Sequence, residues 1–342
     1  MVALFGGRMA AYVPAGWGAP GDSDLGGLAV ISVYALLIVL LSGLLAGSLV
    51  GKDLFHRRFR SPTALRRVAI AVTAVLLLVN VTTLWLSLEG AWVTADLTAT
   101  MAGLTVVAIP MLLLRIPISP AKRSRRVLAI GAHPDDLELA CGGTLAKFVD
   151  SGHEVQVLIM SDGRQGGNVG ARSGDARRGA SFIGLTGIQL FNFTDADLSA
   201  HAQEMIQVIE GAIARFNPDI ILTHSQHDHH QDHQAVHAAT LRAARRHSSI
   251  LCYESPSATR EFDPSVFVDI EDYVEAKVQA VQMHTDQRGK PYMAAERLRG
   301  VAVFRGAQAR RRVAEAYEPI RMLGTELGSF ETEGVGDGVG RK

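Results

Sequence analysis

Hydrophobic residues are distributed unevenly along the chain, and this divides it into two parts. Residues 27–50, 66–88 and 96–116 are predominantly apolar, and the runs 40–50 and 74–79 carry no charge. Each stretch is long enough to cross about 30 Å of hydrocarbon as a helix. These runs lack the polar face of a soluble core helix, and the length and flanks of the first stretch do not fit a signal peptide. We therefore predict three transmembrane helices.

Beyond residue 126, short apolar runs alternate with helical patterns. Residues 127–130, 155–160 and 219–223 have the pattern of buried strands, whereas 137–149 and the segment from Asp232 onward have that of helices. Such alternation predicts an α/β domain with a Rossmann-like, mostly parallel sheet flanked by helices. The roughly 200 residues of this part can bury a complete core.

Charge gives the expected orientation in the membrane. The net charge is zero, but the loop between the first two apolar stretches is basic and the loop between the second and third has no Lys or Arg. Because basic loops stay in the cytoplasm, and a second basic segment follows the third stretch, we place the α/β domain there. Both basic loops could also contact anionic headgroups. The balanced charge does not suggest a nucleic-acid partner.

The predicted organisation has five parts. An extracytoplasmic segment covers 1–26, three transmembrane helices lie within 27–116, a basic linker covers 117–126, the α/β domain covers 127–325 and a glycine-rich disordered tail covers 326–342. Cys141 and Cys252 form no Cys-x-x-Cys pair, and free thiols suit a reducing cytoplasm.

Most metal-capable side chains gather in two clusters, each behind a predicted strand. His133-Pro-Asp-Asp136 follows the strand 127–130, and a histidine-rich stretch from His224 to His237 follows the strand 219–223. Open α/β sheets place their sites at the carboxyl ends of strands, so the two clusters are expected to meet. A hydrolytic metal site typically uses three imidazole or carboxylate ligands and leaves one position for a water whose pKa falls to about 7.

The residue types suggest a role for each member of the site. His133, Asp136 and His233 could supply the three ligands, while Asp135 can point elsewhere and accept a proton from the water. Pro134 restricts the backbone on either side of it and helps to hold the ligands in place.

Further polar residues of the second cluster have supporting roles in this interpretation. His230 could donate a hydrogen bond to a developing oxyanion, with Asp232 or Asp228 orienting an imidazole. Alternatively, histidines four residues apart could bind adventitious metal on one helix face. The presence of both clusters favours a shared site. His224, His227 and His237 are expected to be supporting or surface residues.

At these motifs the chain resembles the LmbE-like or PIG-L family of zinc-dependent de-N-acetylases, over about residues 126–325. Residues 132–138, followed by Gly142-Gly143, are similar to the family's opening motif, and 228–233 are similar to its second, with Gln231 where proline is usual. The resemblance implies that His133, Asp136 and His233 bind Zn²⁺, with Fe²⁺ as the alternative metal. It also implies that Asp135 is the base and that His230 assists at the oxyanion.

Weaker similarities lie between and after the motifs. Arg172 lies in a stretch that resembles the family's Arg-x-x-Glu helix, with Asp175 in place of Glu, and is a candidate sugar-binding residue. Lys277 and 284–287 resemble a segment that shapes the pocket, although a surface helix end fits equally well. The glycine-rich loop 162–168 is either a plain connection or a substrate loop.

The pair Gly142-Gly143 has a separate interpretation. It lacks the spacing of a dinucleotide fingerprint. We instead expect these glycines to let the helix approach the sheet closely.

These features together predict a membrane-anchored, zinc-dependent amidase that deacetylates an N-acetylated amino sugar. Tethering favours a lipid-linked substrate, because it raises the effective concentration of enzyme beside lipid. A soluble thiol-sugar conjugate is the alternative substrate. A non-catalytic sensor of metal or sugar would keep the ligands but would not need Asp135. The near absence of charge in the apolar stretches disfavours a transporter, and the oligomeric state is not predicted.

Overall fold

The computed structural model describes residues 22–86 and 91–323, and the chain divides into two compact units. The first unit contains α1 (Asp22–Val50) and nearly all of α3 (Pro62–Trp85) and α4 (Ala91–Leu113). The second contains residues 52–63 together with the chain from Leu113 onward. The predicted tail 326–342, and residues 1–21 of the predicted amino-terminal segment, lie outside the described residues.

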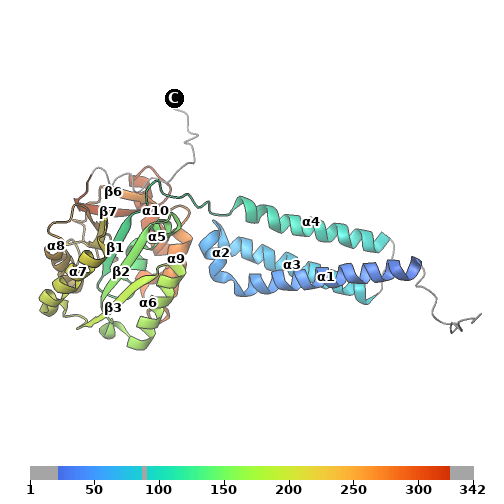
Figure 1. Cartoon of the computed structure of the whole chain (residues 1–342), viewed down its shortest axis with the longest axis horizontal. Coiled ribbons are helices and arrows are strands. Elements are labelled where there is room, and N and C mark those ends of the chain that lie inside the picture. Colours follow the sequence, from blue (N-terminus) through green and yellow to red (C-terminus); the bar gives the residue numbers. More distant parts are fainter. Residues whose placement is uncertain (1–21, 87–90, 324–342) are drawn as a thin grey trace, which may run out of the picture. The chain divides into compact units, whose positions relative to one another are not determined.

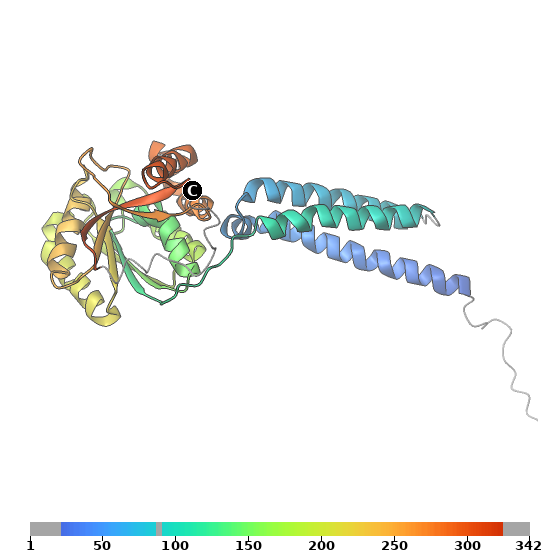
Figure 2. The same cartoon turned by 90° about the horizontal axis from the view of Figure 1, so that it is seen from above.

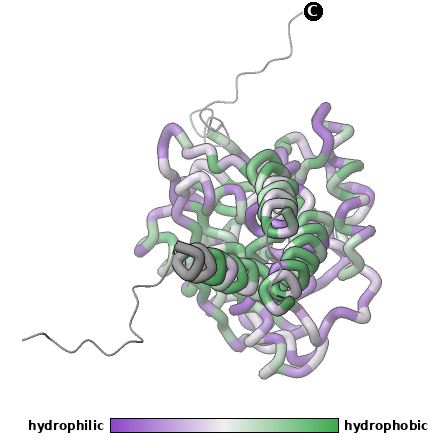
Figure 3. Tube along the Cα trace, turned by 90° about the vertical axis from the view of Figure 1, so that its right-hand side faces the viewer, coloured by the Kyte–Doolittle hydropathy of each residue, from purple (hydrophilic) through white to green (hydrophobic). Residues whose placement is uncertain are grey.

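Three helical stretches of the first unit are long and apolar enough to cross a membrane: 29–50, 62–85 and 91–113. Figure 3 shows apolar residues along much of these helices. The helices α1, α3 and α4 begin at residues 22, 62 and 91, before the predicted starts at 27, 66 and 96. For α3 the reason is Pro62 in the first turn, where the missing N–H would have no intrahelical partner.

Polar side chains also contribute to the packing of the first unit. Asn80 of α3 donates to Thr100 Oγ1 of α4 and to Leu76 O, both at 2.8 Å, and its side chain is fully buried. Hydrogen bonds of this kind help to hold apolar helices together.

The second unit is built on a seven-stranded sheet in the order β3-β2-β1-β4-β5-β7-β6. Strands β1 to β5 are parallel, and β7 runs antiparallel to both β5 and β6. The mostly parallel sheet predicted from the sequence is confirmed. The strands are β1 (Arg126–Gly131), β2 (Glu154–Ser161), β3 (Gly187–Phe193), β4 (Ile220–His224), β5 (Ile250–Tyr253), β6 (Val266–Asp269) and β7 (Ala314–Arg321).

Helices cover both faces of the sheet, as Figures 1 and 2 show. In β1, Val127 and Ala129 pack into one apolar cluster while Leu128 and Ile130 pack into another on the opposite face. Burial on both faces explains why the strand is a continuous apolar run. The first cluster is covered by α5 (Asp136–Asp150), α6 (Val169–Ile183), α9 (Val274–Gln282) and α10 (Ala295–Gln308), and the second by α7 (Ala202–Phe216) and α8 (Gln231–Ala243).

The strand order creates a switch point between β1 and β4. β1 is followed by α5 and then by its neighbour β2, whereas its other neighbour, β4, comes later in the chain. Ligand sites of open α/β sheets lie in the crevice at such a point, outside the carboxyl ends of the strands. Both predicted clusters directly follow these two strands.

The basic loop between the first two long helices contains a helix that the sequence did not predict, α2 (Lys52–Arg58). This segment belongs to the second unit. We expected that this loop could contact anionic headgroups. Arg57, however, is buried and pairs with Asp150, so it is not available for such a contact.

Candidate active site

The first cluster forms the turn between β1 and α5. Asp136 Oδ2 accepts hydrogen bonds from the backbone N–H groups of Ala132 at 3.0 Å and His133 at 2.7 Å. The carboxylate therefore holds the turn that contains it, and Oδ1 remains directed toward the second cluster, where it lies 3.4 Å from His233 Nε2.

The second cluster lies between β4 and the first turns of α8. His230 is the N-cap of α8, and its Nδ1 accepts from Asp232 N at 3.2 Å. Further into the helix, His233 Nδ1 lies 2.8 Å from Asp228 Oδ2. Ser255 and Ser257 also donate to the Asp228 carboxylate. These contacts and burial of the ring hold His233 with Nε2 facing the first cluster.

His133 and His233 each place a ring nitrogen near the carboxylate of Asp136. His133 Nδ1 is 3.5 Å from Asp136 Oδ2, close to the 3.4 Å between His233 Nε2 and Asp136 Oδ1. Two ligand atoms at about 2.0–2.1 Å from a tetrahedral zinc ion lie about 3.3 Å apart. The spacing of each histidine–carboxylate pair thus fits the zinc ion that the resemblance implies, with the two histidines facing different oxygens of Asp136.

The outer nitrogen of each of these histidines faces a carboxylate. His133 Nε2 lies 3.1 Å from Asp195 Oδ1 and 3.2 Å from Asp232 Oδ2, and His233 Nδ1 faces Asp228. Carboxylates in this position orient metal-binding imidazoles and raise their basicity. The structure thus brings both Asp232 and Asp228 beside an imidazole, and their orienting role stays a prediction.

Other groupings of donors are also close. Potential ligand atoms lie within 4.8 Å of one another in three sets: His133, His230 and His233; Asp136, His224 and His233; and His133, Asp195 and Asp232. The predicted trio is therefore divided between the first two sets, which share His233. We favour the trio over a set with His224, because His224 Nε2 already lies 3.0 Å from Ala132 N and 3.1 Å from Asp136 Oδ2.

The electrostatics of the histidines differ from one another. Burial disfavours the charged form of His133 and His233, but neighbouring carboxylates outweigh it, raising the pKa of His133 well above its usual value and that of His233 to about 9. For His230, burial and the nearby imidazoles lower the pKa. Burial is also the main cause that lowers the pKa of His224 to about 4. His133 and His233 therefore lie among carboxylates whose negative charge favours the binding of a cation.

Asp135 points away from the trio. Its Oδ1 lies 3.0 Å from Nη2 of Arg172, and both side chains are buried. Arg172 Nη1 also donates to Gly163 O at 2.7 Å. Arg172, predicted to bind sugar, thus lies at the site in contact with the predicted base.

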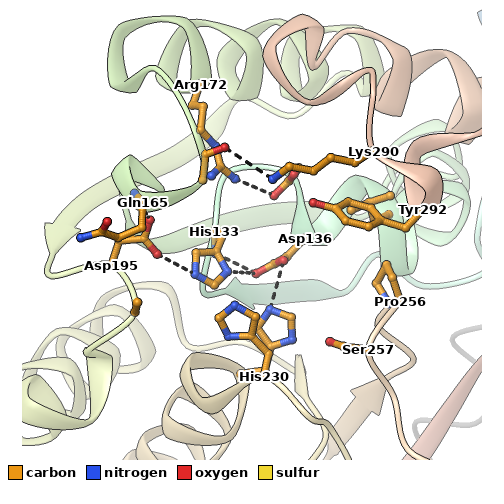
Figure 4. Close-up of a pocket in the computed structure, with 15 residues that line it drawn as sticks. His133, Asp136, Gln165, Arg172, Asp195, His230, Pro256, Ser257, Lys290 and Tyr292 are labelled. Atoms are coloured by element: carbon orange, nitrogen blue, oxygen red, sulfur yellow. Dashed lines mark hydrogen bonds and ion pairs between the residues drawn. The ribbon is translucent and has the colours of Figure 1, made fainter.

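These residues line a cavity of about 330 Å³, shown in Figure 4. This volume falls within the usual range for small-molecule sites. The lining comes from both clusters, α5, the glycine-rich loop, α6, the loop after β3 and two later segments: His133, Asp135, Asp136, Leu139, Gln165, Gly166, Arg172, Asp195, Ala196, His230, His233, Pro256, Ser257, Lys290 and Tyr292.

Several of these lining residues were missed by sequence reasoning. Asp195 follows β3, so the strand-end argument would have found it had that strand been recognised. Its carboxylate also accepts from Gln165 N at 2.6 Å; burial opposes ionisation, but this bond and His133 lower its pKa to about 2. Tyr292 and Lys290 come from a short turn with no comparable local signal.

The segment that contains Lys277 and 284–287 is not a surface helix end. Lys277 is buried and pairs with Glu315 at 2.6 Å, outside the residues that line the cavity. Asp175 of α6 accepts from Thr285 Oγ1 at 3.2 Å and lies near Asp286 N. The segment 284–287 therefore packs on the helix that carries Arg172.

Comparison with known proteins gives the family of this domain. The family model described as PIG-L, GlcNAc-PI de-N-acetylase, matches residues 128–244. The chain is 34% identical to the "Uncharacterized deacetylase YaiS" of Escherichia coli K12 over 174 residues, which are 49% of this chain and 94% of the relative. It is 29% identical over 229 residues to the diacetylchitobiose deacetylase of Thermococcus kodakarensis, covering 57% of this chain and 83% of the relative.

A solved structure agrees at the level of the fold. The conserved protein TT1542 from Thermus thermophilus aligns with a TM-score of 0.53 at 23% identity, over 58% of this chain and 96% of the other. The fold, the arrangement of the two motifs and these similarities lead to one conclusion: the chain belongs to the PIG-L (LmbE-like) family of deacetylases.

Proposed function

We propose that the protein is a membrane-anchored, metal-dependent N-deacetylase that acts on an N-acetylated amino sugar. The observation that carries this proposal is the convergence of His133, Asp136 and His233, with their outer contacts formed by carboxylates, beside Asp135 in a cavity of about 330 Å³. Family membership supports hydrolytic deacetylation as the reaction.

His133, Asp136 and His233 would hold the metal, with Zn²⁺ as our first choice and Fe²⁺ as the alternative. Bound there, the ion would polarise the acetamide carbonyl and lower the pKa of a water molecule. Asp135 accepts the proton of the attacking water, and Arg172 holds its carboxylate in place at 3.0 Å. Asp232 and Asp195 act on the reaction through His133, whose ring they orient.

The tautomer of His230 supports its proposed role at the oxyanion. Since Nδ1 accepts from Asp232 N and the pKa of the ring is lowered, the neutral imidazole carries its proton on Nε2. His230 lines the cavity next to His133, with ring centroids 4.8 Å apart. It can therefore donate from Nε2 to the oxygen of the tetrahedral intermediate.

The sugar specificity rests on the named activities of relatives. One is a diacetylchitobiose deacetylase, and another, from Bacillus cereus, is named a probable N-acetyl-alpha-D-glucosaminyl L-malate deacetylase and is 26% identical over 184 residues. We propose an N-acetylglucosaminyl group as the part of the substrate that enters the cavity. The apolar helices, which would anchor the enzyme, favour a lipid-linked form of it over a soluble glycoside.

A substrate panel tests this proposal. The full chain in detergent is loaded with Zn²⁺ and incubated with N-acetylglucosaminyl lipids and with soluble glycosides such as diacetylchitobiose, and free amine is measured. We expect the wild type to release amine. In Asp135→Asn the rate of release should fall by a factor of about 10²–10⁴, while the variant binds as much metal as the wild type. Equal loss of metal and activity would remove the role assigned to Asp135, and release from no sugar would overturn the proposal.

A further inference from the structure

Residues 52–63 join the first two apolar helices yet belong to the second compact unit, which contains the candidate active site and which we call the catalytic unit. They comprise α2, the turn after it and the first two residues of α3, and we call them the strap. They lie outside residues 128–244, which the family model matches. The strap therefore lies amino-terminal to the part of the chain that the family model matches.

Arg57 makes the central contact of the strap. Its guanidinium forms two hydrogen bonds of 2.7 Å to the two carboxylate oxygens of Asp150, which ends α5. It also donates to Ile183 O at 2.9 Å and Ala146 O at 3.3 Å, the former at the end of α6. A cation at the carboxyl ends of two helices is favourably placed, because the last carbonyl groups there carry partial negative charge.

Burial makes this contact specific. The side chains of Arg57 and Asp150 are only 10% and 6% exposed, so neither charge is well solvated without the other. The guanidinium also lies 6.0 Å from the centre of the Tyr273 ring. Phe55 of the strap is 4% exposed. Because a charge left alone in such a place is costly, the pair favours one docked position of α2.

Contacts on either side of Arg57 extend the docked surface. Arg60 pairs with Asp272 at 2.5 Å, and Gln279 donates to Asp53 at 3.1 Å. The backbone of the strap also pairs with the chain that follows α4. Ile116 N donates to Arg58 O, and Arg60 N donates to Leu114 O, both at 2.9 Å.

We propose that the strap fixes the catalytic unit to the apolar helices independently of the linker 117–125, with Arg57 as its principal contact. The catalytic unit is then joined to the apolar helices through two connections rather than one. The membrane role of the apolar helices belongs to the proposed function, but the strap itself can be tested without a membrane.

The strap is separated from the chemistry. Asp136 begins α5 and Asp150 ends it, so the site and the Arg57 contact lie at opposite ends of a 15-residue helix, about 21 Å apart along its axis. Substitutions in the strap are therefore expected to leave the hydrolysis of a soluble substrate unchanged.

The test cuts the linker and asks whether the strap still holds. A protease site is inserted between Ile118 and Ser119 of the full chain, which carries an amino-terminal affinity tag, in detergent. After cleavage on the resin, we expect the fragment that begins at Ser119 to stay bound in the wild type. In Arg57→Ala it should be washed off, with an apparent dissociation constant raised about a hundredfold or more, as expected for losing one partner of a buried ion pair.

Two further variants serve as controls. Arg67→Ala removes an exposed arginine of α3 outside the strap and should retain the fragment as the wild type does. Arg57→Lys keeps the charge but cannot form the forked contact, so it should give intermediate release. Before cleavage, the Arg57→Ala chain should keep the circular-dichroism spectrum of the wild type, which separates loss of docking from loss of folding.

Two results would overturn the role proposed for the strap. One is release of the wild-type fragment as soon as the linker is cut, and the other is equal retention in Arg57→Ala and wild type. Neither depends on deacetylation or on insertion into a bilayer, so the strap and the proposed function can fail separately.

Discussion

Asp232 is the residue at which three parts of the site meet. Its carboxylate accepts from the backbone of Ala196 at 2.8 Å and of Leu198 at 3.1 Å, and it faces His133 Nε2 at 3.2 Å. It thus connects the loop after β3, the start of α8 and the turn after β1. Because Asp232 does not line the cavity, we expect it to act by orienting His133.

We expect Asp232→Asn to weaken metal binding by about 10- to 100-fold, the usual effect of removing a carboxylate behind a metal-binding imidazole. The amide would still fill the space but would no longer accept as strongly from His133. Competition with a chromogenic chelator measures the affinity. Asp197→Asn, at a nearby exposed carboxylate, is the control, and an unchanged affinity in Asp232→Asn would contradict the orienting role.

At the residue scale the sequence identified much of the candidate site. His133, Asp136, His233 and Asp135 were named because their types and their position behind apolar strands suggest metal-assisted hydrolysis. The structure brings these residues together, although their roles stay predictions. Asp195 could not be placed because β3 was not recognised: its residues are only partly buried, without the apolar run that marked β1.

At the element scale, α5 is interrupted one turn after the catalytic motif. Cys141 has non-helical angles, with φ −132° and ψ 19°. Lys277 donates to Ala140 O at 3.0 Å on one side of the interruption. On the other side, Glu315 accepts from Gly143 N at 3.0 Å and Thr144 N at 2.7 Å. A buried ion pair thus satisfies backbone groups at the kink.

Lys277→Met should therefore lower the free energy of unfolding of the catalytic unit by about 3–5 kcal/mol, because Glu315 would remain buried without its partner. The matched control is Arg299→Met, whose pair with Glu275 is 41% and 22% exposed and should contribute about 0–1 kcal/mol. Urea unfolding followed by circular dichroism measures both. If both variants lost a similar free energy of unfolding, burial of the Lys277–Glu315 pair would not make it more important than an exposed pair.

The close approach expected of the glycine pair is found at Gly143. A Cβ there would lie 2.9 Å from Ile270 Cδ1 and 3.1 Å from Ile270 Cβ, whereas at Gly142 the nearest atom would be an ordinary 3.5 Å away. Only one glycine of the pair is thus needed for packing beside β6.

Gly143→Ala is expected to cost about 1–3 kcal/mol of unfolding free energy, since Ile270 must move or the helix must shift. Gly300→Ala in α10 meets no atom within 4 Å and should instead stabilise by about 0.5–1 kcal/mol. Thermal melting of the two variants should shift in opposite directions. If Gly143→Ala left the melting temperature unchanged, α5 would be free to move away from Ile270.

At the scale of the whole molecule, the apolar helices predict a membrane protein with its hydrolase in the cytoplasm. The strap and the segment after α4 are both basic, while 86–95 contains no lysine or arginine. A green fluorescent protein fused after Lys342 should fluoresce, and an alkaline phosphatase at the same place should be inactive. Phosphatase activity of that fusion would show that the hydrolase lies outside the cytoplasm and would contradict the predicted topology.

The sequence by itself determined the family, the parallel α/β sheet and the number of long apolar helices, because each depends on local patterns: continuous apolar runs, strand-to-helix alternation and two short motifs. Only the tertiary structure decided which loops complete the cavity, where Lys277 is buried and that the loop between two apolar helices docks on the catalytic unit. Those outcomes depend on contacts between residues that are distant in the sequence. Arg57 and its partner Asp150 are 93 residues apart, and Lys277 and its partner Glu315 are 38 residues apart. Contacts at such separations leave no periodic signal along the chain.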